Sequence, residues 1–171
     1  LWKFDRNANQ STIECGLKWL SGNINEDGGW GDTIKNQSNL STTLLCWSAL
    51  AIVKDSPDFT RTIKQAESWL LKHVYSLEPK HISAAVLNHY GKDQTFSVPI
   101  LTACAIAGRL GDDDPWQYVP QLPFELAIFP HSMFRKLNLT VVSYALPALI
   151  AIGLVRHRGR PARNLFMRVL R

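Results

Sequence analysis

The sequence has few cysteines and no closely spaced pair of them. Cys15, Cys46 and Cys104 are the three in 171 residues, and none shows the two-residue spacing of a metal or redox site. All three lie in apolar stretches, so we expect small buried side chains, as is usual for free cysteines in a reducing compartment. A disulfide-stabilised fold is therefore not indicated.

Sequence motifs for nucleotide, nucleophile and metal chemistry are also missing. No Gly-x-Gly-x-x-Gly, Walker or Gly-x-Ser-x-Gly motif occurs, and the histidines form no metal-binding pattern. His81 and His89 are eight residues apart with no acidic or cysteine partner nearby, so we expect solvated or core histidines. Asp112-Asp113-Asp114 runs into Pro115, which favours a hydrated loop before a helical turn over a magnesium site. We expect no metal, no cofactor and no catalytic residue in this chain.

Strand patterns are absent as well, since no alternation of apolar and polar residues is longer than about four. Apolar residues recur instead at helical spacing, as in Ile13, Leu17 and Leu20. A second apolar helix is expected to open at Ser41-Thr42 and to be buried on nearly every side. Further helices are expected from Pro57 to Tyr75, over 82–90 and over 97–110, with Gly91 and Gly111 ending the last two.

The chain length suits a single domain. The first residue is Leu, no signal peptide pattern follows it, and residues 165–171 stop inside a helical-looking segment. We therefore expect residues 1–171 to form one helical domain or part of one, cut from a longer chain at both ends.

A glycine-rich loop is the most specific feature of the sequence. Residues 25–31 read Asn-Glu-Asp-Gly-Gly-Trp-Gly, and glycine pairs permit positive φ and close approach of another segment. We predict that Gly28 or Gly29 has positive φ and that Trp30 is buried as a staple between helices.

Together with Trp19-Leu20, this loop resembles the QW repeat of class II triterpene cyclases, the squalene–hopene cyclase family. The repeat motif residues are Trp19, Asp27, Gly28, Gly29 and Trp30, while Ile24 occupies the position where the family usually has Gln. Prenyltransferase β-subunits and complement-like domains share the architecture. The loop therefore indicates the fold more firmly than the chemistry.

A second motif strengthens the resemblance, which then spans most of residues 12–155. Trp116-x-x-Val119-Pro120-x-x-Pro123-x-Glu125 follows the order and spacing found in squalene–hopene cyclases, and Asn138 and Ser143-Tyr144-Ala145 come after it. Trp19-Leu20 also recurs as Trp69-Leu70, each followed after a loop by an Ala-rich helix. A period of about 50 residues is typical of stacked α-hairpins, although two such pairs also arise by chance.

The resemblance implies an all-α fold, with helical hairpins forming part of an α/α barrel of the terpenoid cyclase and prenyltransferase toroid type. It also implies that the chain is part of a squalene–hopene cyclase-like enzyme, an isomerase that cyclises a polyene after protonating it. The family's proton donor, the middle Asp of an Asp-x-Asp-Asp motif, is missing here, so the isolated chain should be inactive. Its partners would be a triterpene substrate and the remaining half of the parent chain.

The resemblance also suggests substrate-binding residues. Tyr144 follows Ser143 in the position where the family places an aromatic residue, and Phe129 and Phe134 are weaker candidates. Such rings stabilise carbocations by cation–π attraction, although simple packing explains these aromatic residues equally well. The alternative is a non-catalytic helical-repeat module that binds a partner protein or lipid; continuation of the gene into an Asp-x-Asp-Asp segment separates the two interpretations.

Charge is unevenly distributed. Residues 1–125 hold 11 basic and 14 acidic residues, whereas residues 126–171 hold 8 basic residues and no acid. The apolar run 139–155 suggests a transmembrane helix or a buried inner barrel helix, and its short length and Pro147 favour the latter. The arginines that follow it suit an anionic membrane surface better than nucleic acid, namely Arg156, Arg158, Arg160 and Arg163. We expect a cytoplasmic protein, with peripheral (monotopic) contact at the inner membrane face as the family resemblance implies.

Overall fold

The computed structural model describes residues 6–53, 56–122 and 146–161, and every regular element in these ranges is helical. The elements are α1 (Arg6–Gly22), α2 (Leu40–Ala49), the 3-10 helix η1 (Leu50–Val53), α3 (Pro57–Leu70), α4 (Pro79–Tyr90), α5 (Gln94–Ile106), the 3-10 helix η2 (Pro115–Tyr118) and α7 (Leu146–Gly159). The predicted all-α class is confirmed.

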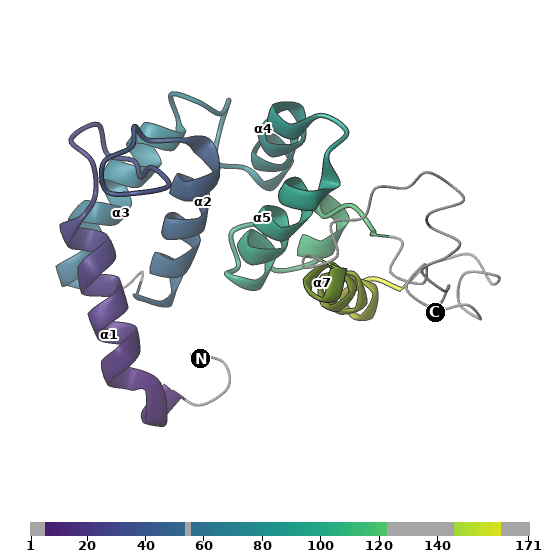
Figure 1. Cartoon of the computed structure of the whole chain (residues 1–171), viewed down its shortest axis with the longest axis horizontal. Helices are drawn as coiled ribbons and strands as arrows, with labels where there is room; N and C mark the ends of the chain where they lie inside the picture. The colour runs from purple at the N-terminus through teal and green to yellow at the C-terminus, as the bar shows by residue number, and fades with distance from the viewer. Residues whose placement is uncertain (1–5, 54–55, 123–145, 162–171) are drawn as a thin grey trace.

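Two helical hairpins make up the centre of the molecule. Helix α2 packs on α3, α4 packs on α5, and α2 and α5 pack on each other, so that the two hairpins are joined through these two helices (Figure 1). Helices α2 and α5 are also the two Ala-rich helices of the suggested repeat. Helix α7 then packs on the other side of α5. This arrangement is consistent with the α/α architecture of terpenoid cyclases.

The core lies where these helices meet. Leu44 and Leu50 from α2 and η1, Leu70 from α3, Ile82 from α4 and Leu101 from α5 are all fully buried. Removing each such side chain from water stabilises the fold by roughly 2 kcal/mol. The helix predicted to be buried on nearly every side, α2, does expose Leu45, which is 40% accessible.

Polar side chains and a proline define where the helices begin. Asn39 caps α2, because its Oδ1 accepts the backbone N–H of Thr42 at 2.9 Å, and the helix begins one residue before the predicted start. Asp93 caps α5 in a similar way, accepting from the N–H of Thr95 at 2.8 Å. Pro57 occupies the first turn of α3, as predicted.

Two predicted helix ends are wrong by several residues. Helix α5 ends at Ile106 rather than at residue 110, because Gly108 has a φ of +75° and the chain turns there. The N–H of Gly108 donates to the carbonyl of Ala105 and that of Arg109 to Cys104, which is the Schellman pattern. Helix α3 ends at Leu70 rather than at Tyr75, although hydrogen bonds of turn type continue the coil to Val74. Gly91 ends α4 as predicted.

The prediction that all three cysteines are buried is wrong for one of them. Cys46 and Cys104 are buried, whereas Cys15 is exposed. Cys15 lies two residues from both Ile13 and Leu17, which places it on the side of α1 away from the core that Leu17 enters. Burial raises the pKa of the Cys46 thiol to about 11.

Helix α7 is a surface helix in this structure rather than the buried helix predicted from its composition. Leu149 and Ile152 are partly buried against the core, while Leu154 and Val155 are 39% and 43% exposed. Within α7, the apolar run therefore presents one side to α5 and leaves another open. None of the helices in the described ranges has the length and apolar character needed to cross a membrane.

Candidate functional site

The glycine-rich loop forms a compact turn between α1 and α2. The N–H of Gly28 donates to the carbonyl of Asn25, and the N–H of Asn25 donates to the carbonyl of Gly29, both at 2.9 Å. Gly28 has a φ of +92°, which confirms the prediction of positive φ at this pair.

Trp30 joins the end of α1 to the start of α2. Its side chain is only 4% exposed, and its indole Nε1 donates to the carbonyl of Leu20 at 3.0 Å. Its backbone N–H donates to Oγ1 of Thr43 at 3.0 Å. The Leu20 carbonyl is in the last turn of α1, where helical partners run out. Burial of Trp30 and its role as a staple between helices are therefore confirmed.

Asp27 is held by three hydrogen bonds, which we call the Asp27 clasp. Oδ1 accepts from the N–H of Gly29 at 3.1 Å and from Oγ of Ser38 at 2.6 Å. Oδ2 accepts from the indole Nε1 of Trp69 on α3 at 2.9 Å. Partial burial raises the pKa of Asp27, but the bonds from Ser38, Gly29 and Trp69 together outweigh it, so the pKa lies below its ordinary value. Asp27 is an ionised acceptor that ties the loop to α3.

A second carboxylate organises the start of α2. Asp32 Oδ1 accepts from Nδ2 of Asn39 at 2.8 Å and from Oγ1 of Thr42 at 2.7 Å, and these bonds lower its pKa. The pKa of Glu78 is also lowered, chiefly by its bond to Lys80. Wherever the pKa of a carboxyl group in the described part of the chain departs from its ordinary value, it is therefore lowered. A proton donor needs a raised pKa instead.

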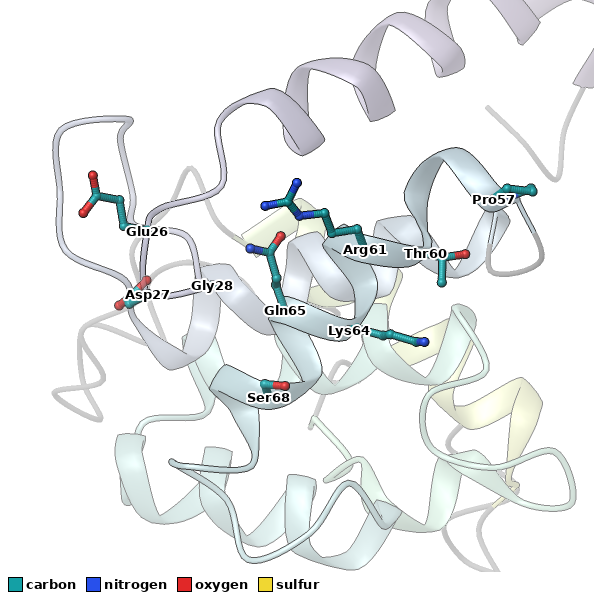
Figure 2. A pocket seen from close by; sticks show the side chains of 9 residues that line it. All are labelled: Glu26, Asp27, Gly28, Pro57, Thr60, Arg61, Lys64, Gln65 and Ser68. Atoms are coloured by element: carbon teal, nitrogen blue, oxygen red, sulfur yellow. The ribbon is translucent and has the colours of Figure 1, made fainter.

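Three adjoining hollows surround the Asp27 clasp. Figure 2 shows the first, a hollow of about 580 Å³ between the loop and α3, toward which Arg61 and Gln65 extend from the helix. A second of about 630 Å³ shares Glu26 and Asp27 with it, and a third of about 670 Å³ shares Trp69 and other residues with the second. The clasp is therefore the common wall of these surface hollows.

The predicted substrate-binding residues Tyr144, Phe129 and Phe134 lie outside the described residues, as does Arg163. Trp19 is 56% exposed, whereas Trp69, its counterpart in the suggested repeat, is 4% exposed.

Of the three predicted anion-binding arginines that the structure describes, two are used within the fold. Arg156 Nε donates to the carbonyl of Val119 at 3.0 Å, and Arg160 Nε lies 3.3 Å from Oδ2 of Asp114. Arg158 is exposed. The ion pair with Arg160 shows that Asp114 contacts another part of the protein and not only solvent. Asp112 and Asp113 are exposed, as expected.

A second polar cluster, which the sequence did not predict, joins α2, α3 and the turn after α5. Trp47 Nε1 on α2 donates to Oε1 of Glu67 on α3 at 3.1 Å. Arg109, just after α5, donates from Nη2 to the carbonyl of Trp47 at 2.7 Å and lies 3.8 Å above its indole ring. The bonded residues are 20 and 62 positions apart in the chain, and such separation hides the contacts from local sequence patterns.

The histidines also differ from expectation in one respect. The expectation that His81 has no acidic neighbour is wrong, because its Nδ1 lies 3.9 Å from Oε2 of Glu78. Across the described residues, no group of three His, Cys, Asp or Glu side chains is arranged to hold a metal ion.

Comparison with known proteins agrees coarsely with the resemblance. The chain is 28% identical over 159 residues to enfumafungin synthase efuA of Hormonema carpetanum, covering 88% of this chain and 10% of that protein. It is 28% identical over 141 residues to the terpene cyclase-glycosyl transferase fusion protein fsoA of Humicola fuscoatra, covering 81% of this chain and 9% of that protein. No family model and no solved structure matches it. The chain thus spans about a tenth of the length of these curated relatives and is similar to one segment of terpene cyclase-type proteins.

Proposed function

We propose that this chain is a scaffold segment of a squalene–hopene cyclase-like triterpene cyclase and does not itself carry the proton donor. The observation that carries the proposal is the Asp27 clasp, in which the acid of the glycine-rich loop accepts three hydrogen bonds, one of them from Trp69 on α3. Similarity to a terpene cyclase-type protein supports the enzyme class.

The electrostatics of the described carboxyl groups support the scaffold role. Protonation of a polyene needs an acid whose pKa is raised so that it keeps a proton to donate. Asp27 and Asp32 have lowered pKa values instead. In the proposal the donor belongs to an Asp-x-Asp-Asp segment elsewhere in the parent protein. Tyr144, Phe129 and Phe134 remain the proposed aromatic contacts to the cationic intermediate.

The experiment compares the isolated chain with the full-length parent protein. Each is incubated with squalene, and the products are separated by gas chromatography with mass detection. We expect cyclised triterpene from the parent and none above the blank from this chain. Asp27→Asn in the parent should leave the product pattern unchanged and lower the melting temperature, whereas Asn at the middle position of the Asp-x-Asp-Asp motif should abolish product. Cyclised product from the isolated chain would overturn the scaffold role.

One observation favours a second candidate, a non-catalytic helical-repeat module that binds a partner protein or lipid. Helix α7 exposes Leu154 and Val155 beside the exposed Arg158, a combination suited to a lipid surface or a partner helix. A parent gene without an Asp-x-Asp-Asp segment, or a full-length protein that makes no product, would favour this candidate.

A further inference from the structure

A hollow lined by three imidazole rings lies between the start of α2, the end of α3 and α4. Its volume is about 670 Å³, and His73, His81 and His89 are its only ionisable side chains apart from the Tyr75 phenol among the described residues. The remaining lining residues are Ser38, Asn39, Leu40, Trp69, Val74, Ala84, Ala85 and Asn88. No carboxylate and no lysine or arginine of the described ranges therefore lines the hollow, and histidine protonation sets its charge.

The imidazole rings are accessible and are oriented by neighbours. His73 and His89 are exposed and His81 is partly exposed, so water and small solutes reach all three. His73 Nδ1 lies 2.8 Å from the carbonyl of Trp69. A carbonyl only accepts, so Nδ1 donates and Nε2 is the atom that takes up a second proton.

Aromatic contacts support a positive charge in the hollow. The His73 ring stacks on Trp69 with centroids 3.7 Å apart, so a proton on His73 adds a cation–π attraction to the stack. Tyr75 meets His81 edge-on at 4.8 Å, and Ser76 Oγ lies 2.7 Å from His81 Nδ1.

Charged groups around the hollow are mostly engaged with other partners. Asp27 is bonded to two residues that line the hollow, Trp69 and Ser38, and Asp32 is bonded to a third, Asn39. Glu78, at the side of His81, is paired with Lys80 at 2.9 Å. Lys72 lines the adjoining hollow together with His73. Glu78 also lies 3.9 Å from His81 Nδ1, so it offsets part of the charge that a protonated His81 brings, whereas His73 and His89 have no such ion pair among the described residues.

We propose that this hollow is a proton-gated binding site for a small oxyanion, such as a phosphate or carboxylate group. Each imidazole that takes up a proton adds a positive charge and a second N–H donor to the hollow, and both favour an oxyanion. The proposal is independent of the cyclase assignment.

Sulfate is the appropriate probe, because it remains a dianion at both pH 5.5 and pH 7.5 and any pH dependence then belongs to the protein. Calorimetric titration at constant ionic strength, with chloride as the competing salt, should give at least tenfold tighter sulfate binding at pH 5.5. If sulfate binding takes up protons, linkage requires the affinity to rise as the pH falls. His73→Gln and His89→Gln should each weaken binding at pH 5.5 at least threefold.

A matched control removes a charge close to the hollow but outside its lining. Lys92 lies three residues after His89, on the exposed turn before α5. The variant Lys92→Gln should therefore leave the sulfate affinity unchanged. Equal losses in Lys92→Gln and His89→Gln, or equal affinity at the two pH values, would overturn the proposal. Circular dichroism melting of each variant identifies any that fails to fold.

A second measurement in the unmodified protein does not depend on any variant. Proton–carbon correlation spectra follow the imidazole rings during a pH titration with and without sulfate. Sulfate should move the titration midpoints of His73, His81 and His89 to higher pH and leave that of His157 on α7 in place. A uniform movement of all four would identify general screening and contradict a site.

Discussion

Gly28 lies against the backbone carbonyl of Gln65 on α3, and a Cβ at position 28 would be 2.8 Å from that oxygen. The same residue has a φ of +92°. Two independent reasons therefore require glycine at this position: the backbone conformation and the close approach of α3.

Gly28→Ala should lower the free energy of unfolding by about 2–4 kcal/mol, combining the cost of positive φ with a steric clash. Gly108→Ala is the matched control, since Gly108 has a φ of +75° but a Cβ there would meet no described atom within 4 Å. It should cost only about 1–2 kcal/mol. Urea unfolding followed by circular dichroism gives both values, and equal costs would mean that the contact with Gln65 contributes nothing.

Trp30→Ala should cost about 3–5 kcal/mol, the range for removing a large buried aromatic side chain. The variant also leaves the Leu20 carbonyl without its indole donor. Trp19→Ala provides the comparison, because Trp19 is 56% exposed and should change stability by no more than about 0.5 kcal/mol. A Trp30 variant as stable as the parent would rule out the staple between α1 and α2.

The contrast between these two tryptophans shows what the sequence predicts well. Turn chemistry is local, so the positive φ at Gly28 and the burial of Trp30 follow from the seven residues of the loop. The repeat pairs Trp19 with Trp69, yet only Trp69 is buried. Its indole N–H donates to Asp27, which lies 42 residues before it in the chain. A hydrogen bond between such distant residues depends on how α3 packs, and no local pattern encodes that packing.

Composition is a similarly limited guide to burial. Cys15 has apolar neighbours in the sequence but lies on the exposed side of α1, since two residues along a helix turn the side chain to the opposite face. Helix α7 is apolar over most of its length, and a uniformly apolar helix carries no periodic signal for which side faces the core. Its partner α5 decides this, through Leu149 and Ile152.

Acid should weaken the fold through Asp27. Its folded pKa lies below the unfolded value of 3.8, so its contribution to stability is present above that value and is lost as the pH falls through the folded pKa. Unfolding free energies measured between pH 6 and pH 2.5 should decline less steeply below pH 4 for Asp27→Asn than for the parent chain. Asp113→Asn, on an exposed loop, should keep the parent's slope. Parallel curves for Asp27→Asn and the parent would show that the clasp does not depend on the charge of Asp27.

The exposed side of α7 should bind anionic lipid if the arginines that follow the apolar run contact a membrane surface. Arg156 and Arg160 are used within the fold, so Arg158 should dominate among the described arginines. An arginine near an anionic surface contributes about 1 kcal/mol at moderate salt, which corresponds to roughly fivefold in affinity. Arg158→Gln should therefore weaken co-sedimentation with phosphatidylserine-containing vesicles about fivefold, whereas Lys18→Gln, exposed on α1, should change it little. Binding should fall at high salt and should be weak for neutral vesicles. Binding that does not change with salt, or that is equal for both vesicle types, would assign these arginines to contacts with protein instead.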